Sequence, residues 1–509
     1  MFRGGFSLEA AEGVIDLSAF PDAPLAMDAV QMLREKSFLA SRETPFGVRY
    51  HMFRAMREFG ESSLRLGEEV VARHAAHFAQ EAKAWESQRV GPRMAEALDR
   101  LDLMRENVLA AIERTLALGR IESAAELALA ISGLLLARGT GRQRVAVPEA
   151  VLAAARAAPG RVGAEAELRL GAALARAYES MGQYQQAEAA AEAAVTRAEA
   201  DGVGPGRAMA EGLTALAEAR RQSGRLDEAV TLHDRAEAIY AGLRDELGLA
   251  RNLGARAMIQ ITRGDRAGAL SSLSRAEKIN RAAHNAVGLI ANLSNHARVL
   301  RDAGDIAGAV ARLEEAERLC RAIGDAGTCA RVIGNKANTL TAGGDVEGAS
   351  RAHAAAESLF LDLGDRTNAA RVAMNRGEVL LRQGRFDEAL ATLDRVKPVM
   401  EELGQKRSVA VLLAGRARAL LGLGRAAEAL ADAEASLAAF GTMGAAGSAE
   451  ALVSHEAKAR ALEATKGADD PATRDAAAAA VRAADALGGG ARASTGGVDL
   501  DRLRRLAGG

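Results

Sequence analysis

A short phrase built around one glycine recurs seven times in this 509-residue chain, and its regular spacing limits the possible folds more than any other feature. The recurring glycines are Gly182, Gly224, Gly264, Gly304, Gly344, Gly384 and Gly424. The first interval is 42 residues and each later interval is 40. A small residue lies seven positions before each glycine, and an alanine lies five positions after it. Such a period is typical of repeat architectures.

Each period has room for two helices, which we call helix A (before the glycine) and helix B (after it). Small residues at the two fixed positions let the helices cross closely, and glycine adopts the left-handed turn conformation that other residues resist. Asp265, Asp305 and Asp345 directly follow turn glycines, so we predict that they cap helix B. Because one hairpin cannot bury its apolar face, neighbouring hairpins must stack. We therefore predict an all-α solenoid.

The composition agrees with closely packed helices. Hydrophobic residues make up 49% of the chain but aromatic residues only 3%, so most apolar residues are small or aliphatic. This composition argues against sandwiches and barrels, which use aromatic and β-branched residues.

The spacing of small residue, glycine and alanine resembles the tetratricopeptide repeat family over about residues 165–440. The resemblance implies a right-handed superhelical solenoid. The repeat of 40 residues is similar to the longer-helix variety of kinesin light chains and bacterial signalling regulators. A second glycine series, Gly324, Gly364, Gly404 and Gly444, is expected to form the turns between later hairpins.

The predicted array occupies residues 161–466. A divergent hairpin is expected around Gly119 and Ala124, and a degenerate last unit in which Ala464 replaces the turn glycine. Residues 467–509 are predicted to form a capping helix that opens at Pro471 and a flexible tail, disordered over 488–509.

The amino-terminal residues do not carry the repeat. We predict helices over 8–15 and 25–38 and a hairpin over 40–56 that turns near Pro45-Phe46-Gly47. This order suggests a small winged-helix-like domain over 1–67, followed by a helical connector over 68–160.

Four phrases in this region resemble the segment that follows the nucleotide-binding core of STAND-type signalling ATPases. They are FRGGFSLEAA at 2–11, MFRAMREF at 52–59, RHAAHF at 73–78 and ENVLAA at 106–111. The chain contains no GxxxxGK[ST] phosphate-binding loop. The resemblance implies a fragment or stand-alone derivative of a larger ATPase, with a nucleotide-binding domain encoded upstream as a partner. In a complete protein, a change in the repeats would regulate nucleotide exchange.

Charge and reactive residues favour neither nucleic-acid binding nor catalysis. The chain has 66 Lys and Arg against 67 Asp and Glu, which is a poor composition for binding phosphates. We find no catalytic motif, and His74 with His77 is the only close histidine pair, so we expect no enzyme, metal or cofactor. Cys320 and Cys329 are interpreted as two buried thiols in a reducing compartment. With no apolar run of membrane length, we predict a cytoplasmic protein.

The strongest functional hypothesis concerns the concave face, which helix A lines in a stacked array of this kind. Positions 40 residues apart form columns along this face. The candidate groove residues are Arg251, Asn295, Arg298, Arg301, Arg331, Asn335, Asn338, Arg371, Asn375, Arg382 and Arg418. Asparagine can bond both polar groups of a peptide main chain, and arginine can bind a carboxylate through two nitrogens.

We therefore predict a non-catalytic protein–protein interaction or sensor module in cytosolic signalling or transcriptional regulation, which binds an acidic or extended peptide. Three alternatives stay open. The asparagines could merely join neighbouring repeats, the winged helix could bind DNA, or the array could be a constitutive assembly scaffold.

Overall fold

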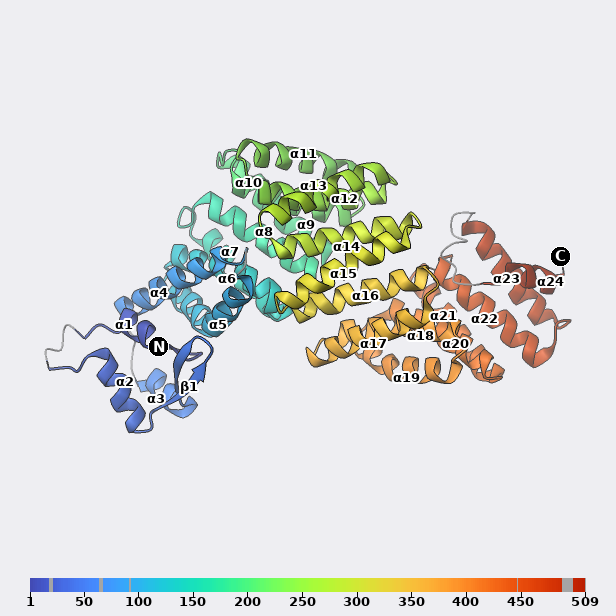
Figure 1. Cartoon of the computed structure of the whole chain (residues 1–509), viewed down its shortest axis with the longest axis horizontal. Helices are drawn as coiled ribbons and strands as arrows, with labels where there is room; N and C mark the ends of the chain where they lie inside the picture. The colour runs from blue at the N-terminus through green and yellow to red at the C-terminus, as the bar shows by residue number, and fades with distance from the viewer. Residues whose placement is uncertain (18–21, 64–66, 91–92, 446, 488–497, 509) are drawn as a thin grey trace. The chain divides into compact units, whose positions relative to one another are not determined.

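The computed structural model describes residues 1–509 except 18–21, 64–66, 91–92, 446, 488–497 and 509. It contains two compact units, Met1–Asn295 and His296–Gly509, which we describe separately. Both are built mainly from consecutive antiparallel helices (Figure 1). Among the described helices, none has the length and apolar content needed to cross a membrane.

The first unit begins with short elements and continues with long helices. Its elements are α1 (Leu8–Val14), α2 (Ala26–Glu35), β1 (Leu39–Thr44), β2 (Gly47–Met52), α3 (Arg54–Ser63), α4 (Glu68–Ser87), α5 (Met94–Ala117), α6 (Ile121–Arg138), α7 (Gly141–Ala157), α8 (Ala164–Ser180), α9 (Tyr184–Ala200), α10 (Arg207–Gln222), α11 (Leu226–Gly242), α12 (Glu246–Thr262) and α13 (Arg266–Ala282). The helix α14 (Ala286–Asp302) includes the boundary between the units.

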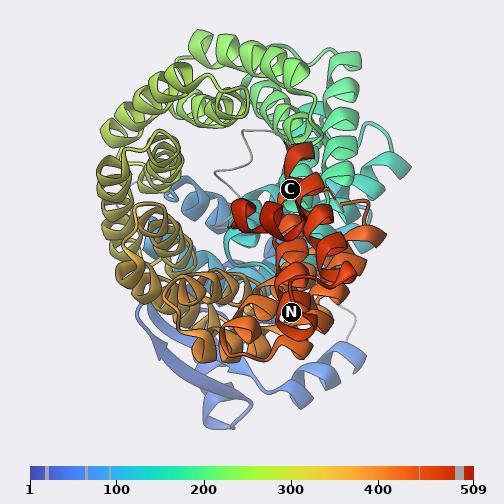
Figure 2. The ribbon, with the colours of Figure 1, turned by 90° about the vertical axis from the view of Figure 1, so that its right-hand side faces the viewer.

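The second unit continues the same pattern of hairpins. Its helices are α15 (Ile306–Ala322), α16 (Ala326–Ala342), α17 (Val346–Asp362), α18 (Arg366–Arg382), α19 (Phe386–Glu402), α20 (Lys406–Gly422), α21 (Ala426–Thr442), α22 (Ala449–Lys466), α23 (Pro471–Leu487) and α24 (Leu500–Leu506). Within each unit, successive hairpins follow one another side by side (Figure 2). The predicted all-α solenoid is confirmed.

The predicted amino-terminal helices and hairpin are also present. Strands β1 and β2 pair antiparallel from Leu39 opposite Met52 to Thr44 opposite Gly47. The hairpin is shorter than predicted because β2 ends at Met52 and α3 begins at Arg54. The winged-helix assignment and the four domain boundaries stay predictions.

The first residues of the chain pack into the amino-terminal region. Asn107 is fully buried, and its side chain accepts from the amide of Arg3 at 2.8 Å and donates to the carbonyl of Gly5 at 2.7 Å. Phe6 forms a β-bridge with Tyr50. These contacts tie the segment to both the hairpin and α5.

Each repeat hairpin has the predicted packing at its turn. The seven turn glycines have φ values between 71 and 86°. The alanines five positions after them are fully buried. Of the residues seven positions before them, six are alanines that are at most 1% exposed, and the seventh, Gly377, is also buried. At Gly344, the amide of Asp345 donates to the carbonyl of Leu340 at 3.0 Å, which closes the end of α16. The earlier hairpin at Gly119 is confirmed, with φ of 69° and a buried Ala124.

The predicted aspartate caps are confirmed and form part of a longer series. Asp265, Asp305 and Asp345 accept from the amide three positions later at 2.8–2.9 Å. The same bond begins the A helices, with the caps Asp245, Asp325 and Asp365. Because each cap contributes about 1 kcal/mol, both turns of these repeats are stabilised locally.

Two of the turns between hairpins use residues other than glycine. Gly324, Gly364, Gly404 and Gly444 have the predicted left-handed conformation, with φ of 66–70°. At the equivalent turns of earlier repeats, Arg244 and His284 have φ of 54 and 52°. Their side chains make this conformation unfavourable, so the tertiary packing must impose it.

We expect Arg244→Gly and His284→Gly each to raise the free energy of unfolding by about 0.5–1 kcal/mol, because glycine has no Cβ penalty in this conformation. Chemical denaturation would measure the change. As a matched control, Gly264→Ala has space around the new Cβ but keeps φ near 77°, so it should lower stability by about 1 kcal/mol. Unchanged midpoints for both glycine variants would contradict this account.

The two cysteines are bonded to each other, so the prediction of two free thiols is wrong. Cys320 lies in the last turn of α15 and Cys329 in the first turn of α16, and the turn between them brings their Cα atoms to 5.3 Å. The cysteines therefore no longer support the prediction of a reducing compartment.

The carboxyl-terminal predictions need two corrections. The turn predicted at Ala464 is wrong because α22 continues through this helix-favouring residue to Lys466 and turns at Gly467, with φ of 93°. Pro471 opens α23 as predicted. The disorder predicted for the tail is wrong over 498–508, where Leu503 and Leu506 of α24 pack into the apolar cluster of α22 and α23. Residues 488–497 and 509 lie outside the described residues.

Ion pairs join four A helices, α12, α16, α18 and α20, to the B helix that precedes each of them. The basic residue lies eight positions before the turn glycine, and the acidic residue lies 19 positions earlier in three of the pairs and 22 positions earlier in the fourth. The pairs are Arg256 with Glu237 at 2.8 Å, Lys336 with Glu317, Arg376 with Glu357 at 3.7 Å and Arg416 with Asp394 at 2.7 Å. We call this series the ion-pair ladder. In each pair, at least one of the two side chains is largely shielded from solvent. Separating the hairpins would leave a shielded charge without its partner, so the ladder contributes to stacking between hairpins.

Removing one carboxylate tests the ladder. Glu357 is almost fully buried and also pairs with Arg395, so Glu357→Gln leaves two arginines without their anion. We expect a loss of about 2–3 kcal/mol in the free energy of unfolding. The exposed Asp362 on the same helix provides a control, since Asp362→Asn should change stability by less than about 0.5 kcal/mol. Equal effects of the two variants would show that the ladder adds no stability.

His353 gives the stack a dependence on pH. Its ring is 1% exposed in α17, and neither ring nitrogen has a hydrogen-bond partner among the described residues. Burial and then the nearby Arg376 lower its pKa to about 4, so the ring is neutral in the folded protein at pH 5. In the unfolded chain, the pKa of His353 has its ordinary value of about 6.5.

As the pH falls, His353 binds a proton in the unfolded chain before it does so in the folded protein. The contribution of neutral His353 to the free energy of unfolding is therefore complete above about pH 6.5 and is lost as the pH falls toward 4. Between pH 7 and 5 we expect a loss of about 2 kcal/mol from this group. Equivalent positions in other repeats hold Leu273, Leu313 and Leu393, so His353→Leu is the matched variant. It should be less sensitive to acid than the wild type in urea titrations, and parallel pH profiles would refute the assignment.

Candidate functional site

The A helices of the second unit bring most of the candidate residues together. Helix α16 packs on α18, and α18 packs on α20. Residues 13, nine, six and two positions before each turn glycine lie on one side of these helices, since the four positions recur at helical spacing. We call this side of α16, α18 and α20 the inner face.

Two arginines on the inner face have no carboxylate partner among the described residues. Arg331 donates to the hydroxyl of Thr328 at 2.7 Å, and Arg371 donates to the side-chain oxygen of Asn368 at 3.1 Å. Both side chains are exposed. Each bond is to a neutral group one turn away in the same helix, so both positive charges are available to a ligand.

The asparagines of this face divide into two kinds. Asn375 donates to the side-chain oxygen of Asn338 at 3.4 Å, a long bond that joins α16 to α18. For Asn338 and Asn375, the alternative that the asparagines join neighbouring repeats therefore applies. Asn335 is exposed, and its side chain makes no hydrogen bond within the described part of the chain. Its amide and carbonyl are both accessible to a peptide.

Glu378 neutralises one end of the inner face, and the sequence analysis missed it. Its two oxygens pair with Arg418 at 2.7 Å and with Arg382 at 3.5 Å. The only available indication was its place in the same column as Asn338 and Arg418. The polar inner-face columns of α16, α18 and α20 thus carry four arginines and one glutamate, for a formal charge of 4 − 1 = +3.

The remaining candidates lie elsewhere. Arg251 and Asn295 belong to the first unit, where Arg251 lies 3.6 Å from Glu211. Arg301 pairs with the adjacent Asp302 at 2.8 Å, and Arg298 is half-buried. The eleven candidates therefore do not form one described surface, and those on α16, α18 and α20 are the coherent set.

The neighbours of His74 and His77 are those of packed side chains. His74 is fully buried against the rings of Phe2 and Phe78, and burial lowers its pKa to about 3, which keeps it neutral. His77 lies 3.4 Å from Glu81. The described residues contain no group of three or more potential metal ligands.

The basic side chains near the amino terminus are partly used internally. Arg49 donates to the carbonyls of Gly5 and Leu103, and Arg57 donates to the carbonyl of Arg3. These bonds reduce the number of cations free to contact phosphates. The guanidinium of Arg100 lies between the rings of Phe46 and Trp85 at 4.6 and 4.5 Å.

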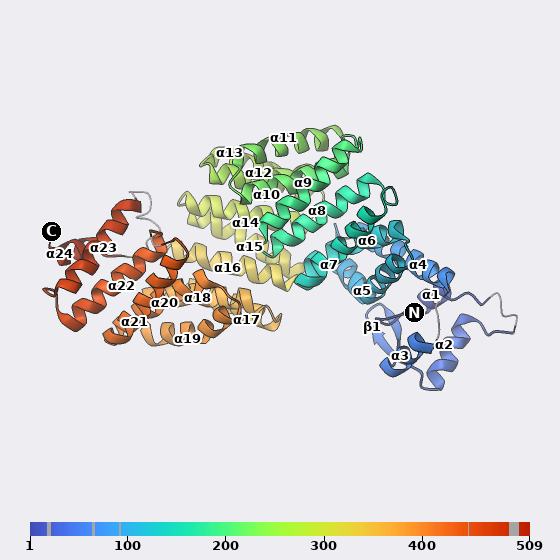
Figure 3. The ribbon, with the colours of Figure 1, turned by 180° about the vertical axis from the view of Figure 1, so that it is seen from behind.

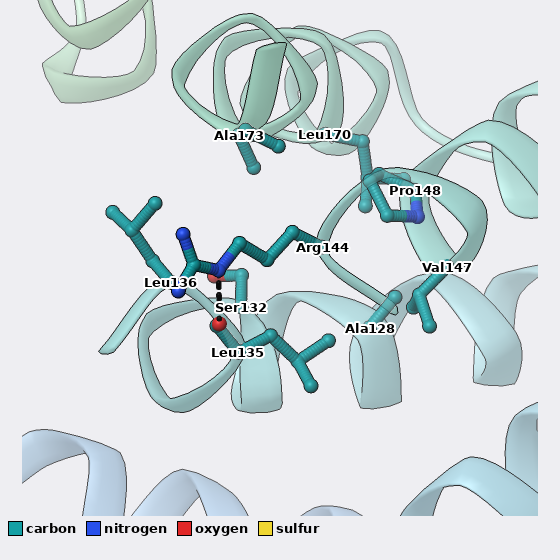
Figure 4. A pocket seen from close by; sticks show the side chains of 10 residues that line it. Ala128, Ser132, Leu135, Leu136, Arg144, Val147, Pro148, Leu170 and Ala173 are labelled. Atoms are coloured by element: carbon teal, nitrogen blue, oxygen red, sulfur yellow. Dashed lines mark hydrogen bonds between the residues drawn. The ribbon is translucent and has the colours of Figure 1, made fainter. Parts of the chain in front are cut away.

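A small cavity between α6, α7 and α8 is too small for an organic ligand. Its volume is about 20 Å³, close to that of one water molecule. Figure 4 shows Arg144 crossing it to donate to the carbonyl of Leu135, which closes the end of α6.

Comparison with protein families identifies the repeats. Residues 172–201, 213–246 and 368–441 match models described as the tetratricopeptide repeat. No curated protein shows significant sequence similarity to the chain.

Several solved structures have a similar fold. A STAND protein with a tetratricopeptide repeat sensor from Pyrococcus horikoshii has a TM-score of 0.52 and 15% identity, over 82% of this chain and 57% of that protein. The match therefore spans little more than half of the STAND protein. A Rap protein complexed with competence and sporulation factor has a TM-score of 0.45 and 13% identity, over 68% of this chain and 98% of the other. Aspartyl phosphate phosphatase F from Bacillus subtilis has a TM-score of 0.46 and 12% identity, over 75% and 96%.

Proposed function

Because the chain is built from tetratricopeptide repeats like those of a STAND sensor, we propose that it is a non-catalytic protein-interaction module whose second unit binds an acidic, extended peptide on the inner face. The observation that carries this proposal is the contrast between two sets of basic residues. Those of the ion-pair ladder have carboxylate partners, whereas Arg331 and Arg371 have none within the described residues.

The arrangement of the inner face suits an extended segment. Neighbouring packed helices lie about 8–10 Å apart, so Arg331 and Arg371 present two charges at about that interval. An extended peptide advances about 3.3 Å per residue, so acidic side chains about three residues apart would meet both arginines. Asn335 would bond the main chain between them.

The corresponding face of the first unit is less suited to an acidic ligand. At the same four positions of α8, α10 and α12, the ionisable side chains are three arginines and two glutamates: Arg169, Arg176, Arg251, Glu211 and Glu218. Arg221 pairs with Glu218, and Arg251 lies near Glu211. The formal charge of 3 − 2 = +1, against +3 on the second unit, supports placing the peptide on the second unit.

The same resemblance supports a proposal for the biological role. We place the module in cytosolic signalling or transcriptional regulation, where peptide binding would alter the stacking of the repeats. DNA binding by residues 1–67 and a constitutive scaffold remain the alternatives; the internal bonds of Arg49 and Arg57 favour the peptide-binding role over the first.

We expect Arg331→Ala with Asn335→Ala to weaken binding of a fluorescein-labelled peptide, Glu-Ala-Ser-Glu-Ala-Ser-Glu, at least tenfold in fluorescence anisotropy. The variant loses one charge-assisted contact and one main-chain contact. Its circular dichroism should match the wild type because both side chains are exposed.

Arg351→Ala is the charge-matched control, since it removes an exposed arginine from the B helix α17. It should leave the affinity unchanged. Peptide binding that survives in the double variant, or that falls equally in the control, would refute the inner face as the site. Constitutive complexes unaffected by the double variant would instead favour the scaffold.

A further inference from the structure

A groove of about 530 Å³ lies among α7, α8 and α9 in the first unit, at the start of the repeat array. Figure 3 labels these three helices. Its lining includes Leu152 of α7, Gly171 and Leu174 of α8, and Ala190 and Ala194 of α9. The α8 residues that line it are on the opposite side of that helix from positions 169, 173 and 176, which correspond to the inner face. The groove is thus separate from the proposed peptide site.

The groove contains an alanine at a position where three other B helices carry an arginine. Eleven positions after the turn glycine, α11, α13 and α19 hold Arg235, Arg275 and Arg395. Each of them reaches a glutamate of the preceding B helix: Glu199, Glu237 and Glu357. The equivalent residue of α9 is Ala193, which also lines the groove. No side chain from this position crosses to α7.

The wall that α9 and Gly171 of α8 form in the middle of the groove has little side-chain bulk. Beyond Ala193, α9 contributes Ala189, Ala190 and Ala194, and the Cβ that Gly171 lacks would lie 2.3 Å from the Cβ of Ala194. The two helices are in close contact here, so the groove is a preformed apolar surface. Because its walls are small side chains, the occupant must supply the large ones.

The two ends of the groove differ in charge. Helices α7 and α9 run in the same direction, since each is antiparallel to α8 between them. Arg156 and Arg197 lie near the carboxyl ends of α7 and α9, and Glu149 lies at the other end, where it accepts from the hydroxyl of Tyr178. Glu167 of α8 also lines the groove and interacts electrostatically with Arg197. Arg197 pairs with Asp201 at 2.6 Å, whereas Arg156 bonds only a carbonyl of its own helix. Arg156 is therefore the more available cation.

We propose that this groove binds an amphipathic helix of a partner protein, which lies antiparallel to α7 and α9 with large aliphatic side chains toward α8 and acidic residues in its first turn beside Arg156. The lining of α9 runs from Gln186 to Arg197, which is about 17 Å at 1.5 Å per residue. About three turns of helix fill this length. Acidic residues in the first turn also match the dipole of the bound helix.

The test uses the full chain and two labelled 14-residue helical peptides. Both carry leucines at positions 4, 8 and 11 in an alanine background; one begins with two glutamates and the other with two lysines. We expect the wild type to prefer the glutamate peptide at least fivefold in fluorescence anisotropy. Ala193→Arg should fill the groove and lower the affinity at least tenfold.

Ala435→Arg is the matched control, because Ala435 lies at the same exposed position of α21. It should bind as the wild type does. Arg156→Ala should reduce the preference for the glutamate peptide without abolishing binding. The double variant of Arg331 and Asn335 should bind both helical peptides normally, which separates this groove from the inner face.

Three results would overturn the proposal: no binding of either peptide by the wild type, equal binding of the two peptides, or unchanged binding after Ala193→Arg. The remaining possible occupant is a second copy of this chain, and sedimentation of the unliganded chain tests for it. If the wild type dimerises and Ala193→Arg is monomeric, the groove binds a second copy of this chain, and the partner helix is refuted.

Discussion

The close crossing of helix A and helix B at two small residues is the contact on which every hairpin depends. In the hairpin of α16 and α17, Ala337 and Ala349 are both fully buried beside the turn at Gly344. Larger residues at this crossing would separate the helices and remove the contact along their length. The short turn then requires a left-handed residue, and the aspartate after it caps the next helix. The hairpin is thereby determined by local interactions before any neighbour stacks on it.

This local origin explains what could be predicted from the sequence. The turns, caps and crossings depend on residues within about 12 positions, so the pattern around Gly344 is sufficient to predict its hairpin. Arg244 and His284 were not predictable as left-handed residues, because their own preferences oppose that conformation and only the surrounding hairpins impose it. The helix α24 was missed for a related reason: Leu503 and Leu506 become ordered on apolar surface supplied by α22 and α23.

The candidate site shows the same division. The 40-residue period placed Arg331 and Arg371 in one column, and the structure keeps them on one side of neighbouring helices. Whether an arginine has a partner depends on another helix, however, and the period alone cannot show it. Arg376 finds Glu357 on the preceding B helix, and Arg418 finds Glu378 on the preceding A helix. The recurrence of Glu237, Glu277, Glu317 and Glu357 at intervals of 40 was the overlooked indication that one basic column is structural.

These dependencies leave some positions free to vary while the fold is kept. Arg275 and Arg395 are about half exposed, and each adds a second cation to a glutamate that already pairs within the ladder, with Arg256 and Arg376 respectively. Losing such a cation costs about 0–1 kcal/mol, because the exposed pair is screened by solvent. An alanine at this position, as at Ala193, therefore removes the second cation at small cost and leaves no long side chain to cover the adjoining surface. The crossing and the ladder preserve the stack, and substitutions outside them can create separate binding surfaces on its two sides.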